Sequence, residues 1–196
     1  MSAQTPQATL RTSMGLPAGR LAMWWLLASE IVIFGGLLGS YLVLRLANPS
    51  WGIEAQHMKQ FAGTLNTLVL LTSSLSAVLA HAAAERKDTK KAVRYLLVTV
   101  LGAVLFMVIK LFLEYIPELS EGLTPMKSGY WAFYYLSTGL HGAHVIAGAI
   151  AMLVILPDVS KGINLQRVEY VGIYWHFVDA VWIFLFPLFY IASASH

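Results

Sequence analysis

The last apolar segment of this 196-residue chain contains a histidine and an aspartate, His176 and Asp179, among aliphatic and aromatic neighbours. A charged side chain at the centre of a bilayer costs about 2.5 kcal/mol or more on insertion scales, so ionisable residues at that depth indicate a function or a buried polar contact. Spaced three positions apart, the two side chains lie on one face of a helix, where they can meet each other or share a partner.

Five further ionisable residues fall inside apolar segments. Glu30 lies in the first segment, and its carboxyl group favours the neutral form in a low dielectric unless a charge is near, so structural and transport roles are both open. His141 and His144 lie three positions apart in the fourth segment. Lys110 and Glu114 lie four positions apart in the third, and we expect an outer-face pair if Lys110 extends its ammonium group outward.

Three kinds of site can use these histidines. Axial haem ligation needs imidazoles from two helices, for which His144 and His176 are a candidate pair, because His141 and His144 share one helical face. A metal site can combine a histidine pair with Glu30 or Asp179. The third possibility is a buried hydrogen-bond network in which carboxylates and imidazoles satisfy one another. The spacing alone does not choose among them, although composition favours the network.

The elements that must position these residues are five apolar stretches, each long enough to cross about 30 Å of hydrocarbon. They raise the hydrophobic content to 58% and leave 12% charged residues, against about 25% charged residues in soluble domains. Backbone groups in lipid must be paired within each segment, so the predicted fold class is an all-α integral membrane bundle. One membrane domain is expected over residues 21–196 after a polar cytoplasmic tail at 1–20. Its helices are expected at about 21–46, 61–84, 92–116, 130–156 and 168–192.

The distribution of basic residues predicts the orientation of the bundle. If the N-terminus is cytoplasmic, nine Lys and Arg residues lie inside: Arg11, Arg20, Arg86, Lys87, Lys90, Lys91, Arg94, Lys161 and Arg167. Three lie outside: Arg45, Lys59 and Lys127. This bias follows the positive-inside rule and predicts an N-in, C-out topology. The net charge of +3 is thereby explained by the membrane, and no nucleic-acid partner is expected.

Small and polar residues predict how the helices pack. Close approach is expected along the first helix at Gly35, Gly36, Gly39 and Ser40. Hydrogen bonds between helices are expected from the second helix, at Asn66, Thr67, Ser73 and Ser74. Aromatic residues near the helix ends predict interfacial belts at Trp24, Trp25, Tyr130, Trp131 and Tyr190. Residues 117–128, which include Glu118 and Glu121, are predicted to form an acidic outer loop.

The polar residues occur in motifs that resemble subunit III of the haem-copper oxidases, the cytochrome c oxidase and quinol oxidase complexes. The first helix has Ala28-Ser29-Glu30-Ile31, and the second has Asn66-Thr67 with Ser73-Ser74. Glu114-Tyr115 ends the third helix. The fourth and fifth helices contain GLHGAHVIAG at 139–148 and YWHFVDAVW at 174–182. These motifs follow the family's order over residues 24–190, and the last two are specific to it.

The resemblance implies a non-catalytic subunit of a proton-translocating terminal oxidase. Such a subunit packs directly against subunit I, with subunits II and IV as further candidate partners, supports proton uptake and binds phospholipid. Haem and copper are then held by partner subunits, and Glu30 corresponds to the family's carbodiimide-reactive glutamate. The chain has no cysteine, which independently excludes iron–sulfur clusters and a dinuclear copper site with bridging thiolates.

Five helices instead of the seven of the longer family form suggest a bacterial plasma membrane protein. The wall that the two missing helices form around a lipid-filled cleft is then absent or supplied by another subunit. Three alternatives remain open from the residues: a related subunit associated with nitric oxide reduction, a small proton-coupled transporter that uses Glu30 and Asp179, and a haem-binding cytochrome.

Overall fold

The computed structural model describes residues 18–191, and all regular structure in this part of the chain is helical. Five spans are long and apolar enough to cross a membrane. They are α1 (Ala18–Ala47), α3 (Gln60–Glu85), α4 (Thr89–Ile109) with its extension, α6 (Gly129–Ser160) and α7 (Gln166–Phe186). The predicted all-α bundle of five membrane helices is confirmed. The predicted tail at 1–20 lies outside the described residues up to position 17, and residues 18–20 belong to α1.

The third span is longer than predicted. After α4 the chain continues without a break through a π-helical segment, η1 (Lys110–Tyr115), and then α5 (Ile116–Ser120). Pro117 lies in the first turn of α5, directly after the π-helical segment, and does not interrupt the span. The prediction that the outer loop begins at residue 117 is therefore wrong. Glu118 belongs to the helix and is 1% exposed.

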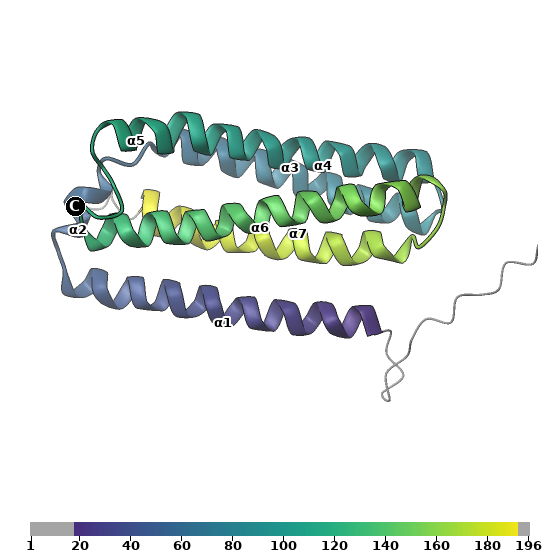
Figure 1. Cartoon of the computed structure of the whole chain (residues 1–196), viewed down its shortest axis with the longest axis horizontal. Coiled ribbons are helices and arrows are strands. Elements are labelled where there is room, and N and C mark those ends of the chain that lie inside the picture. Colours follow the sequence, from purple (N-terminus) through teal and green to yellow (C-terminus); the bar gives the residue numbers. More distant parts are fainter. Residues whose placement is uncertain (1–17, 192–196) are drawn as a thin grey trace, which may run out of the picture.

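Two helices, α6 and α7, form the centre of the bundle. They lie between α1 on one side and the antiparallel pair α3 and α4 on the other (Figure 1). Asp88, in the turn between α3 and α4, caps the N-terminus of α4. Its side chain accepts a hydrogen bond from the Lys91 backbone N–H at 3.1 Å. Two short elements complete the described chain: α2 (Trp51–Ala55) before α3, and the π-helical η2 (Pro187–Ile191) after α7.

Close helix approach occurs at glycines other than those predicted. A Cβ added at Gly102 would lie 2.6 Å from the Ser73 Cβ, so α3 and α4 touch at this point. A Cβ at Gly63 would lie 2.8 Å from the rings of Phe186 and Tyr190. The three glycines of α1 that were predicted to allow close approach have no such neighbour within 4 Å: Gly35, Gly36 and Gly39. In the described part of the chain, α1 packs along the side that faces α6 and α7, and these three glycines do not bring it closer to another helix.

The expected aromatic belt is only partly formed. Trp24 and Trp25 are 61% and 71% exposed, as expected for side chains that face lipid or its interface. Tyr130, Trp131 and Tyr190 are instead fully buried, so the prediction for these three is wrong. The short helix α2 covers this end of the bundle and packs its Trp51 ring edge-on against Tyr130, 6.4 Å between centroids.

Candidate functional site

Lys110 lies at the centre of a buried polar cluster. It is 2% exposed, and its ammonium group donates hydrogen bonds to Glu114 Oε2 at 2.6 Å, Tyr134 OH at 2.9 Å and Tyr190 OH at 2.5 Å. The rings of Tyr115 and Tyr134 also face the cation, with centroids 5.1 and 4.6 Å from Nζ. The predicted pair with Glu114 is present, but the expectation that Lys110 extends outward is wrong, because the bundle supplies its partners internally.

Glu114 is the acceptor that connects the helices of this cluster. Its carboxyl group receives hydrogen bonds from Lys110, from Tyr134 at 3.0 Å, from Tyr190 and from the Asn66 amide at 3.4 Å. These donors come from η1, α6, η2 and α3. Charge-assisted hydrogen bonds are about twice as strong as neutral ones, so this set of donors stabilises a buried carboxylate.

The π-helical geometry of η1 explains why the third span can bury three ionisable residues that are spaced four positions apart. Most buried positions of α4 recur every three or four residues, as expected for an α-helix: Ala92, Leu96, Thr99, Ala103 and Phe106. Lys110, Glu114 and Glu118 recur every four residues and are all buried. A π-helical turn shifts this register, and such turns are frequent at functional sites.

Glu118 is the member of the cluster that sequence reasoning missed. Tyr134 OH lies 3.1 Å from Glu118 Oε1, and its single hydrogen can be donated either to this oxygen or to Glu114. Glu118 Oε2 is buried without a hydrogen bond to any described residue. Pro117 and Gly122 suggested a loop at this point, whereas the repeat of charged residues at 110, 114 and 118 was the available signal for a continued helix.

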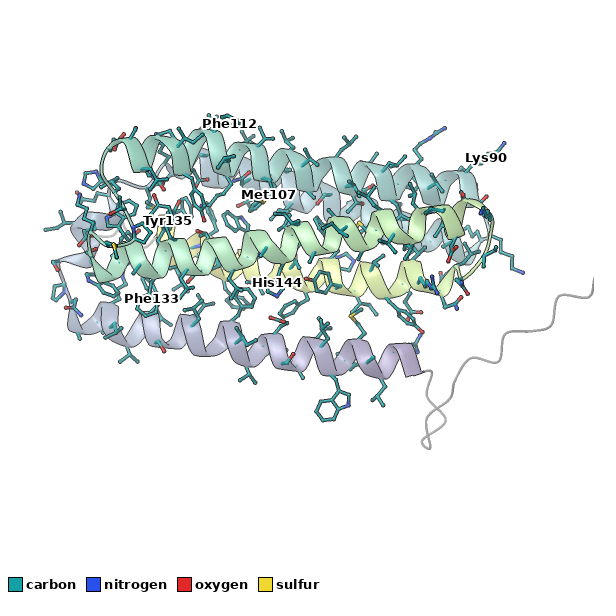
Figure 2. The ribbon with its side chains drawn as sticks, in the orientation of Figure 1. Lys90, Met107, Phe112, Phe133, Tyr135 and His144 are labelled. Atoms are coloured by element: carbon teal, nitrogen blue, oxygen red, sulfur yellow. The ribbon has the colours of Figure 1, made fainter. Side chains whose placement is uncertain are left out.

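A second polar contact joins α1 to α6 near the middle of the bundle, where Figure 2 shows His144. His144 Nε2 lies 3.0 Å from Glu30 Oε2, within ion-pair distance. The other ring nitrogen, Nδ1, lies 2.8 Å from the Leu140 carbonyl oxygen, which can only accept, so Nδ1 carries a hydrogen. The ring of His144 thus links the α6 backbone on one side to the Glu30 carboxyl group of α1 on the other.

The remaining predicted residues, His141, His176 and Asp179, are not brought together with this pair. His141 is fully buried and stacks on Trp182 at 5.2 Å, with neither ring nitrogen in a hydrogen bond. His176 Nδ1 lies 2.8 Å from Ser74 Oγ. Asp179 is 5% exposed, and neither of its carboxyl oxygens has a hydrogen-bond partner in the described part of the chain.

Hydroxyl groups of α3 accept hydrogen bonds from two tryptophans of α7. The indole N–H of Trp175 donates to Ser73 at 3.2 Å, and that of Trp182 donates to Thr67 at 3.0 Å. These contacts confirm the predicted hydrogen bonds between helices. Within residues 18–191, no three His, Asp or Glu side chains are grouped so that they could hold a metal ion.

The fold and this polar core define a multi-pass membrane protein, a five-helix bundle with ionisable residues paired in its interior. The family profile "Cytochrome c oxidase subunit III" matches residues 7–194. The chain belongs to this family, and membership favours that assignment over the transporter and cytochrome alternatives.

Several similar proteins align with most of this chain. Cytochrome c oxidase subunit 3 of Corynebacterium diphtheriae is 35% identical over 171 residues, which cover 84% of this chain and 83% of that protein. The subunit 3 of Alkalihalophilus pseudofirmus is 32% identical over 201 residues, covering 94% and 97%. The heme-copper oxidase subunit I+III of Aeropyrum pernix is 33% identical over 185 residues, covering 88% of this chain and 22% of that protein.

Proposed function

We propose that this chain is the non-catalytic subunit III of a haem-copper terminal oxidase, in which it stabilises subunit I and supports proton uptake. The observation that carries the proposal is the family match over residues 7–194. In the relative from Aeropyrum pernix, subunits I and III are named as one polypeptide. A covalent link of this kind requires two adjacent subunits, which supports direct packing of this chain against subunit I.

Haem and copper belong, in this proposal, to the partner subunits. Four ionisable residues of the core are engaged in pairs within this chain, Lys110 with Glu114 and His144 with Glu30. Subunit I is the direct partner, with subunits II and IV as further candidates. Phospholipid fits an apolar groove of about 410 Å³ between α1 and α7, whose lining includes Ile31, Phe34, Phe177 and Phe184.

We further propose an N-in, C-out orientation in a bacterial plasma membrane. The nine-to-three distribution of Lys and Arg supports it. The basic residues Lys90 and Lys161 follow the second and the fourth span, so both lie at the end of the bundle that an N-in topology places in the cytoplasm. Figure 2 shows Lys90 projecting from that end.

The proposal is tested by comparing the intact oxidase with an enzyme depleted of this chain. Because the chain contributes no redox ligand, the haem spectrum and the initial rate of oxygen consumption should be largely retained. If the chain supports proton uptake and the integrity of subunit I, activity should then fall progressively over many turnovers, and faster at high pH, where protons are scarce. Immediate loss of all turnover, accompanied by loss of a haem signal, would show that the chain supplies ligands and would overturn the proposal.

A further inference from the structure

The cluster around Lys110 contains two carboxyl groups but one buried ammonium group. Glu114 accepts hydrogen bonds from the ammonium group at 2.6 Å, from Tyr190 and from Asn66. The Tyr134 hydroxyl lies 3.0 Å from Glu114 and 3.1 Å from Glu118 Oε1, and its single hydrogen can go to only one of them. Within residues 18–191, Glu118 Oε2 has neither a hydrogen-bond partner nor contact with solvent. The two carboxyl groups therefore differ sharply in how well a negative charge on each would be compensated.

The balance of charge in the cluster determines whether the Glu118 carboxyl group is ionised or protonated. An unpaired buried charge costs far more than a buried neutral polar group. Lys110 neutralises one carboxylate, and the ion pair at 2.6 Å is with Glu114. If Glu118 were also ionised, the buried site would carry a net negative charge. A proton on Glu118 removes that charge.

The groups that face Glu118 do not supply a second compensating cation in the interior. Lys59, which precedes α3, interacts with Glu118 electrostatically, but its side chain is partly exposed and no ion pair joins the two within residues 18–191. The other titratable neighbours are neutral hydroxyls or the pair already described: Tyr115, Tyr130, Tyr134, Tyr135, Tyr190, Lys110 and Glu114.

We propose that the Lys110 cluster is a proton-binding site in which Glu118 holds one exchangeable proton, set by the excess of carboxyl groups over cations. The proton exchanges with water at the C-terminal end of the third span, close to Glu118, where Ser120 and Glu121 are exposed. This inference concerns a site distinct from the Glu30–His144 pair, and it stands whether or not the chain supports proton uptake by a partner.

Infrared spectroscopy of the purified oxidase complex tests the site. A carboxylic acid has a C=O stretch that a carboxylate lacks, and this stretch shifts when the acid proton is replaced by deuterium. The difference between wild type and Glu118→Gln should contain one such band, sensitive to D₂O. The control Glu121→Gln alters an exposed residue and should leave that band in place. A difference spectrum without the band, or a band that never responds to D₂O, overturns the proposal.

Glu114→Gln tests the charge count itself. This change removes the carboxylate beside Lys110 but leaves Glu118 in place, so the ammonium group becomes available to Glu118 and the same band should disappear. Persistence of the band would mean that the proton on Glu118 does not depend on the number of cations, which overturns the proposal. If Glu118→Gln does not assemble, Glu118→Asp keeps the acid and should shift its C=O frequency, and an unshifted band contradicts the assignment.

Discussion

Lys110 Nζ lies 2.6 Å from Glu114 Oε2 inside the bundle, and neither side chain extends to the membrane surface. The pair reaches α6 through Tyr134 and η2 through Tyr190, and Glu114 reaches α3 through Asn66. One ion pair on the third span therefore connects three other parts of the bundle, and its removal should affect the packing of all of them.

Lys110→Met should destabilise the chain strongly. The substitution leaves the Glu114 carboxylate buried without its cation, and breaking a buried pair in this way costs about 3–5 kcal/mol. The effect should appear as a lower unfolding temperature and a lower yield of folded chain in mild detergent. Lys90→Met, at an exposed position, is the control and should have little effect.

The double variant Lys110→Met with Glu114→Gln should recover part of this loss. Replacing both members removes the unpaired charge, so the double variant should be more stable than Lys110→Met alone. Additive losses in the same unfolding measurement would show that the two residues do not act as a pair.

Gly102→Ala should weaken the contact of α4 with α3. The new methyl group would meet the Ser73 Cβ at 2.6 Å, and overpacking of this kind costs about 1–3 kcal/mol. Gly36→Ala is the matched control, since no atom lies within 4 Å of the added Cβ and alanine favours a helix. Thermal unfolding of the two variants side by side checks this, and equal stability would show that the helices can separate at no cost.

Glu30 should react with a carbodiimide that enters from the lipid. Its side chain is 17% exposed and faces His144, whereas Glu85 at the end of α3 is 68% exposed. A hydrophobic carbodiimide should therefore label Glu30 before Glu85 and Glu121, and a water-soluble one should show the reverse order. Peptide mapping by mass spectrometry measures both, and the same order with both reagents would place Glu30 in contact with water.

Single cysteines should report the two sides of the membrane. The chain has no cysteine of its own, so Lys90→Cys and Ser120→Cys each provide one thiol, both at exposed positions. An impermeant thiol reagent added to intact cells should label position 120 and not position 90, because the basic turn at Lys90 is predicted to be cytoplasmic. Labelling at position 90 alone would reverse the proposed topology.

The candidate site was only partly predictable, and the Lys110 cluster shows why. Four-residue spacing was enough to pair Lys110 with Glu114. The direction of the lysine side chain was not predictable, because it depends on the hydroxyl groups of Tyr134 and Tyr190, which come from spans that are distant in sequence. The hydrogen bond from Lys110 also explains why Tyr190 is buried where a belt position was expected.

The sequence by itself determined the five membrane helices and the family to which the chain belongs. Apolar length is a local property that lipid converts directly into helices, and the motifs at 139–148 and 174–182 are contiguous in the chain. Only the tertiary structure decided which glycines meet a neighbouring helix, that Glu118 lies inside the bundle, and that His144 meets Glu30 while His141 stacks on Trp182. These outcomes depend on the rotation of each helix against its neighbours, which is set by contacts between spans and not by spacing within one.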